Sequence, residues 1–88
     1  MGAFLVERRI EGLDRLQVAA VQRCLLLSSR GTEVRYLRTT WLPAERRCLC
    51  LFEAPGPESV RQVNDTAQVP FTWILPAIDL DAGRIEAR

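Results

Sequence analysis

Two glutamates at the ends of predicted strands are the first candidates for chemistry. Glu7 follows the apolar run FLV, and Glu53 follows CLCLF. A carboxylate among apolar neighbours must pair with a cation, bind a ligand or shift its pKa. We expect Arg38 to be the partner, with Arg35 as the alternative. The favoured interpretation is a buried structural pair of Glu53 with Arg38, or plain solvation at a strand end. The alternative is a ligand-binding or catalytic carboxylate.

The cysteines are the second candidates. Cys48 and Cys50 form a C-x-C pattern in a predicted strand, so both thiols project from one face. Cys24 can approach them if that face meets the first helix, and three thiolates could hold a soft metal. Structural zinc motifs, however, generally use C-x₂₋₄-C on turns, and free cysteine packs as a small hydrophobe. We therefore expect core packing, with metal or redox chemistry as the alternative and a disulfide least favoured.

Three further polar or aromatic residues could line a site. Plain alternation puts Tyr36 and Trp41 on opposite faces of their strand, where each could line a pocket or belong to the core. Asn64 lies on a helix that otherwise points valines and alanine inward, so it is either at the surface or in the site. The predicted ligand-binding set is Glu7, Tyr36, Arg38, Cys50, Glu53 and Asn64.

The composition excludes several chemistries. The chain of 88 residues has no histidine, and all twelve basic residues are arginine. It therefore lacks the usual neutral-pH general base and the lysine of Schiff-base or phosphate-loop chemistry. The net charge is +1, and no basic run exceeds two residues, so we expect no nucleic-acid partner. Such pairs as Arg8-Arg9 are expected to be solvated surface charge.

The sequence also bears on the location of the protein and on its cofactor. No apolar stretch approaches the length needed to span a membrane, and no signal peptide is visible. We therefore predict no membrane partner and a cytoplasmic location. No catalytic residue and no metal ligand set is assigned, and the cofactor is unknown.

Turn and capping residues define the elements that must position these side chains. Asp14 and Gln17 form a capping box, and Gly31 is a plausible helix stop. Gly56 as N-cap and Pro57 at the first helical position begin a second helix. The expected elements are a strand at 3–8, a helix from 14 to about 29, strands at 34–42 and 47–54, a helix from 57 to the proline at 70, and a strand at 71–80.

This order, β-α-β-β-α-β, predicts the α+β class with a ferredoxin-like arrangement. A four-stranded antiparallel sheet would carry both helices on one face. In strand 47–54, however, one face reads Cys-Cys-Phe and the other Leu-Leu-Glu, so neither is clearly polar. A single domain at 1–80 with a polar tail at 81–88 has nothing left to cover the second face. We therefore predict a homodimer packed sheet to sheet, a dimeric α+β barrel.

Motifs along nearly the whole chain resemble a known family. They are FLVER, the Gly12-Leu13 helix entry, VRYLRTTWLP, RCLCLFEAP, SVRQVND and QVPFTWILPAIDL. Together they are similar to a family of small bacterial proteins of unknown function, which includes an actinobacterial nickel-binding protein. The resemblance implies a ferredoxin-like dimeric fold. It also places Asn64 where some relatives carry a histidine.

The leading hypothesis is a homodimer that binds a small ligand or a metal ion. The alternatives are a cofactor-independent enzyme of the dimeric α+β barrel type, monooxygenase- or isomerase-like, and a purely structural assembly module. Without imidazole, a borderline divalent ion loses its best ligands. We therefore predict weak or no Ni²⁺ binding. Titration calorimetry tests this, and a submicromolar affinity would contradict it.

Overall fold

The computed structural model describes residues 1–83, and the element order is the predicted one. A short 3₁₀ turn, η1, joins the second and third strands. The elements in chain order are β1 (Gly2–Arg9), α1 (Arg15–Ser29), β2 (Arg35–Leu42), η1 (Pro43–Glu45), β3 (Arg47–Ala54), α2 (Pro57–Ala67) and β4 (Trp73–Ala77).

The helices begin where the sequence predicts. The Asp14 side chain accepts a hydrogen bond from the Gln17 amide at 2.8 Å, and the Gln17 side chain accepts one from the Asp14 amide at 3.0 Å. This reciprocal pair satisfies amide groups that a helix start otherwise leaves unpaired. Gly56 is the N-cap of α2, and Pro57 occupies its first turn. Helix α2 ends earlier than predicted, because Gln68 adopts a left-handed conformation with φ of 58° before Pro70 is reached.

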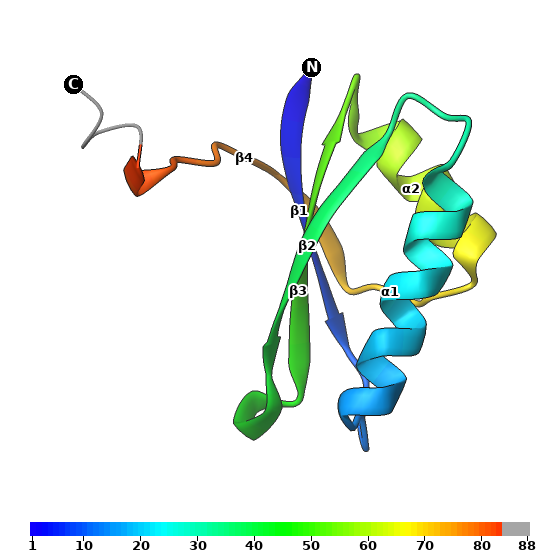
Figure 1. The fold of residues 1–88 in the computed structure, drawn as a ribbon, viewed down its shortest axis with the longest axis vertical. Helices are drawn as coiled ribbons and strands as arrows, with labels where there is room; N and C mark the ends of the chain where they lie inside the picture. Colours follow the sequence, from blue (N-terminus) through cyan, green and yellow to red (C-terminus); the bar gives the residue numbers. More distant parts are fainter. Residues whose placement is uncertain (84–88) are drawn as a thin grey trace.

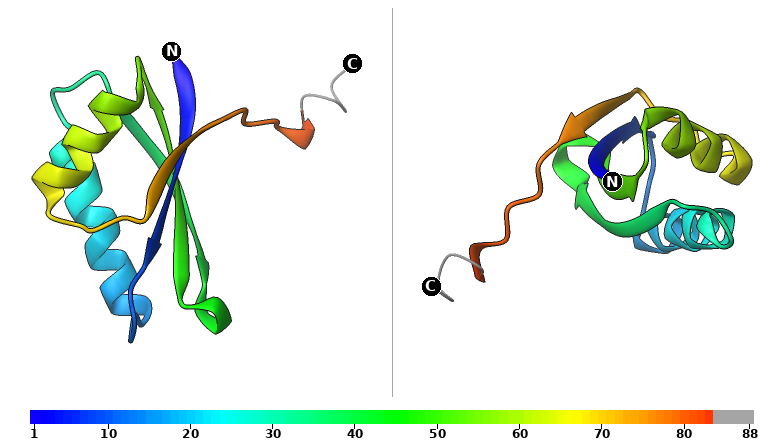
Figure 2. Two further views of the ribbon diagram at one scale, coloured as in Figure 1. Left: turned by 180° about the vertical axis from the view of Figure 1, so that it is seen from behind. Right: turned by 90° about the horizontal axis from the view of Figure 1, so that it is seen from above.

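The four strands form one antiparallel sheet in the order β2-β3-β1-β4. Both helices cover one face, here called the inner face, as Figures 1 and 2 show. The opposite face, here called the outer face, carries no helix formed by residues 1–83. The ferredoxin-like α+β prediction is therefore confirmed. β4 is an edge strand, which is where a strand can accommodate Pro76.

The core lies between the inner face and the two helices. Phe4 and Val6 of β1 and Cys50 and Phe52 of β3 are buried there against Leu25 of α1. The other fully or nearly buried members of this cluster are Val34, Ala54, Val60 and Val63. Cysteine acts here as the small hydrophobe that the sequence predicted.

A bulge in β2 changes which residues share a face. Tyr36 pairs with Phe52, but Arg38 already pairs with Leu51, so Leu37 is an extra residue in the strand. Plain alternation is therefore broken at this point. Tyr36 and Trp41 both lie on the inner face, because Trp41 pairs with the inward-facing Cys48. The prediction that these two aromatic residues lie on opposite faces is wrong for this reason.

Helix α1 and the C-terminal segment both leave apolar groups in solvent. The apolar residues of α1 are only partly buried, since Leu16 is 80% exposed and Leu27 is 61% exposed. β4 is shorter than the predicted strand at 71–80. Residues 78–83 instead run away from the sheet on the side opposite the helices (Figure 2). The predicted polar tail at 81–88 lies partly outside the described residues.

Candidate functional site

The outer face carries a groove with an apolar floor and a polar rim. Leu5 of β1 and Leu49 and Leu51 of β3 form the floor. Arg38 and Thr40 of β2 stand at one side, and the chain from Ala77 to Asp79 walls the other. The groove has a volume of about 250 Å³. This lies just below the usual range for small-molecule sites, so it suits a small ligand.

The ion pairs on the outer face show that the predicted Glu53–Arg38 pair is wrong. Glu53 pairs with Arg35 at 3.1 Å, which was the alternative partner. Arg38 instead donates to Asp79 at 2.7 Å. All four side chains are substantially exposed, so neither pair is a buried structural pair. In the register of β2 and β3, Arg35 lies directly opposite Glu53, whereas Arg38 lies opposite Leu51.

Glu7 is buried on the outer face, and both of its carboxylate oxygens are occupied. Arg9 Nε lies 3.1 Å from one oxygen, and Arg47 Nη1 lies 3.0 Å from the other. Burial works to raise the pKa of Glu7, but the hydrogen bonds and charges of Arg47 and Arg9 outweigh it. Together they hold the pKa below its usual value. Glu7 is therefore a structural carboxylate that remains charged at neutral pH.

Arg8 is a buried polar residue that the sequence prediction missed. It was expected to be solvated, yet its side chain is 0% exposed. Arg8 Nη2 donates to Asn64 Oδ1 at 2.7 Å, and Nη1 donates to the carbonyls of Val69 and Pro70, both at 3.3 Å. The Asn64 amide donates in turn to the Val60 carbonyl at 2.8 Å, which fixes its orientation.

The charge of Arg8 is compensated by a helix end. Among residues 1–83 it has no carboxylate within ion-pair distance, and its Nε has no hydrogen-bond partner. The groups that accept from its guanidinium lie at or just beyond the C-terminal end of α2, where the helix dipole is negative. Alternation could have predicted this burial, since Arg8 follows Phe4 and Val6 at two-residue spacing on the inner face.

Tyr36 and Cys50 share a second polar group on the inner face. The Tyr36 hydroxyl contacts the Thr39 hydroxyl, and the Thr39 oxygen lies 3.1 Å from Cys50 Sγ. Burial raises the pKa of Tyr36. It also raises the pKa of Cys48, with a smaller effect from Cys50, and the opposing effect of Arg8 is too weak to reverse the shift. Cys48 therefore stays a protonated thiol at neutral pH.

The three cysteines do not form one cluster. Cys24 is exposed on α1, whereas Cys48 and Cys50 are buried on β3. The possible approach of Cys24 to the other two is therefore wrong. Within residues 1–83, no group of three or more cysteine, aspartate and glutamate side chains is placed to hold a metal ion. In the same part of the chain, neither helix is long and apolar enough to cross a membrane.

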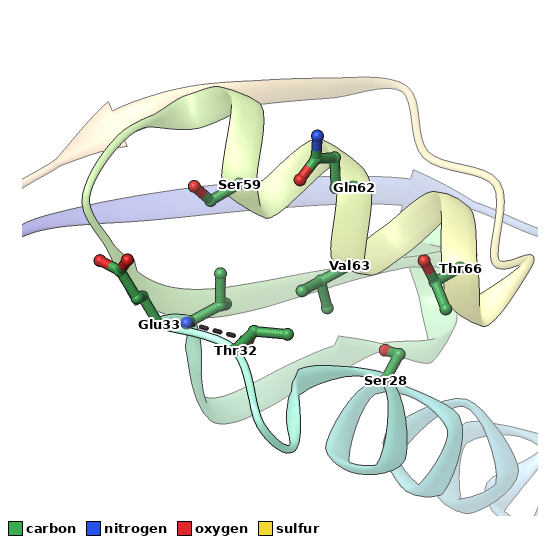
Figure 3. A pocket seen from close by; sticks show the side chains of 8 residues that line it. Ser28, Thr32, Glu33, Ser59, Gln62, Val63 and Thr66 are labelled. Carbon is green, nitrogen blue, oxygen red and sulfur yellow. Dashed lines mark hydrogen bonds between the residues drawn. The ribbon is translucent and has the colours of Figure 1, made fainter.

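A second hollow, with a volume of about 280 Å³, lies between the C-terminal end of α1, the loop that follows it and one side of α2. Figure 3 shows its side chains around the gap, with Glu33 and Ser59 at one end and Ser28 and Thr66 at the other. The Thr32 hydroxyl is already engaged, since it accepts from the Val34 amide. The sequence prediction did not identify this hollow, because its hydroxyl residues come from three separate segments.

The six predicted site residues are divided between the two faces of the sheet. Tyr36, Cys50 and Asn64 lie on the inner side. Glu7, Arg38 and Glu53 lie on the outer side. The sheet separates the two groups, so a single chain does not bring the six into one site. Only Arg38 lines the outer groove.

The strand order and the two helices on one face define this molecule as a ferredoxin-like α+β domain. A crystal structure of SCO4226 from Streptomyces coelicolor A3(2) matches it with a TM-score of 0.80 and 23% identity. The match covers 91% of this chain and 99% of that one, and at this identity it shows the fold alone.

The sequence itself identifies the family. The model of the SCO4226-like family, described as nickel responsive proteins, matches residues 4–76. The chain therefore belongs to the SCO4226-like family, which confirms the resemblance seen in the motifs. No curated protein matches the chain in sequence.

Proposed function

We propose that this protein is a homodimer that binds a small ligand in the outer groove of its sheet. The observation that supports this most is the uncovered outer face, where Leu5, Leu49 and Leu51 form an apolar floor beside Arg38. The chain's own helices lie on the other side. A second copy placed sheet to sheet would cover the groove and exclude water from it. The interior between sheet and helices is already filled by buried side chains.

The groove chemistry favours a ligand with an apolar body and an acidic head. Its floor is leucine, and among the described residues that line it, the one cationic group is the Arg38 guanidinium. That guanidinium already binds the Asp79 carboxylate at 2.7 Å. A ligand carboxylate could take the place of Asp79, because guanidinium and carboxylate form strong charge-assisted hydrogen bonds. Thr40 adds a hydroxyl beside it.

Octanoate is a suitable probe for this proposal. We expect it to shift the amide resonances of β1 and β3 around the floor, and octylamine to bind more weakly because it would meet Arg38. Replacement of Arg38 by glutamine should weaken octanoate binding by roughly tenfold, the effect of losing one charged hydrogen bond. Two-dimensional NMR titration measures both affinities.

The matched control is Arg35→Gln. Arg35 lies on the same strand and face, but its partner is Glu53 and it does not line the groove. Octanoate affinity should be unchanged in this variant. Equal loss in both variants would indicate a general effect of surface charge, and equal binding of octanoate and octylamine would contradict the acidic-ligand proposal.

A nickel function is the second candidate, and only the family description favours it. The chain has no histidine, and the Glu7 carboxylate is held by two arginines. The thiol of Cys48 is protonated inside the core, whereas a metal ligand must be deprotonated. These features support the expectation of weak Ni²⁺ binding stated above. Neither an enzyme nor a purely structural module gains support from the family.

A further inference from the structure

We propose that residues 78–83, here called the C-terminal arm, pack onto the outer face of a second copy of this chain. This inference rests on the proposed homodimer and names the part that completes its groove. Each groove would then be walled in part by apolar side chains of the partner chain. The arm is visible in Figures 1 and 2 as the orange-red segment that leaves the sheet on its uncovered side.

The alternation of side chains along the arm gives it two different sides. The sequence from Ile78 reads Ile-Asp-Leu-Asp. Asp79 turns toward its own sheet, where Arg38 holds it at 2.7 Å. In an extended chain the neighbouring side chains point the opposite way. Ile78 and Leu80 are accordingly exposed, at 84% and 82%, although Ile78 also borders the groove of its own chain.

The surface that best fits this apolar side is the outer face of another copy. Its centre is the leucine floor of the groove, together with the half-exposed Leu75 of β4. Arg35 and Arg38 on β2 and Arg9 on β1 lie around that centre, and each already pairs with a carboxylate of its own chain. The apolar side of the arm and the apolar floor are therefore the complementary parts of the two surfaces.

The outer face and the arm also occur on the same side of the molecule. In a two-fold arrangement, a surface that one copy offers is offered by the other as well. Two sheets facing each other would thus bring each arm toward the opposite floor. The second copy is the occupant that meets these conditions without any further component.

Mixed labelled dimers test the placement directly. Chains carrying ¹³C-labelled methyl groups are mixed with unlabelled chains, and contacts between chains are recorded by isotope-filtered NMR. We expect contacts from the methyl groups of Ile78 and Leu80 to Leu49 or Leu51 of the other chain. A wild-type dimer without such contacts would overturn the inference and leave the homodimer standing.

Substitution gives an independent measurement. The double variant Ile78→Ser/Leu80→Ser should raise the dimer dissociation constant by roughly a hundredfold in sedimentation, as expected for losing two buried apolar anchors. The matched control is Leu16→Ser/Leu27→Ser on α1, which removes apolar groups of comparable exposure from the opposite side. An unchanged constant in the arm variant, or equal weakening in both, would contradict the inference. A monomeric wild type would contradict the proposed homodimer as well.

Discussion

Replacement of Arg8 by methionine should lower the melting temperature by about 10–20 °C. The change leaves Asn64 Oδ1 and the carbonyls of Val69 and Pro70 without their donor. A buried acceptor left unpaired costs about 1–3 kcal/mol, and some of this is recovered if water enters the shallow hollow beside Asn64. A net loss of about 2–4 kcal/mol corresponds to the stated shift in a domain of this size. Thermal unfolding followed by circular dichroism measures it.

Two further variants separate the local network from general charge effects. Arg35→Met removes an exposed guanidinium whose surface ion pair is worth at most about 1 kcal/mol, so its effect should be small. Asn64→Leu should destabilise the protein, and the double variant with Arg8→Met should lose less than the sum of the two. An Arg8→Met protein that is more stable than the wild type would show that the cost of burying the charge exceeds its bonds. That outcome would point to a functional reason for keeping it.

Replacement of Leu75 by arginine should convert the proposed dimer into a monomer. Leu75 lies on the outer face of β4 opposite Leu5, and it is half exposed in the single chain. The fold therefore tolerates a longer polar side chain there, whereas a sheet-to-sheet interface would have to bury the new charge. A loss of at least about 2 kcal/mol, the size of an interface hot spot, weakens association about thirtyfold or more. Analytical ultracentrifugation across a concentration series measures this shift.

The control for this variant is Leu16→Arg on α1. It introduces the same side chain at an exposed leucine on the helical side of the molecule. We expect the oligomeric state to be unchanged and the melting temperature to stay close to that of the wild type. If Leu16→Arg disrupts the dimer and Leu75→Arg does not, the helices and not the sheet form the interface.

The fold could be predicted because the residues that begin the helices and join the strands act on neighbours close in the sequence. The capping box at Asp14 and the Gly56-Pro57 entry set the helix starts, since each satisfies or avoids free amide groups. The β2–β3 hairpin followed from two strands joined by a short turn. The end of α2 was less predictable, because Gln68 adopts a conformation that usually marks glycine.

The candidate site was harder to predict, because it depends on register. A bulge at Leu37 has no glycine or other local marker in the sequence, yet it separates Tyr36 from Arg38. The predicted partner of Glu53 was wrong because the pairing register of β2 and β3 places Arg35, and not Arg38, directly opposite Glu53. Arg8 was missed because two adjacent arginines suggest solvated charge, whereas alternation along β1 sends Arg8 inward and Arg9 outward.

The bulge at Leu37 adds a residue to β2 without adding one to β3. Deleting Leu37 would let Arg38 follow Tyr36 directly, and residues 38–42 would keep their present facing, because Tyr36 and Arg38 already pair with the neighbouring residues Phe52 and Leu51. Deleting Thr40 instead would reverse the facing of Trp41 and turn its side chain to the open side of the sheet. Over evolution, this strand should therefore lose a residue at the bulge more readily than at the positions after it.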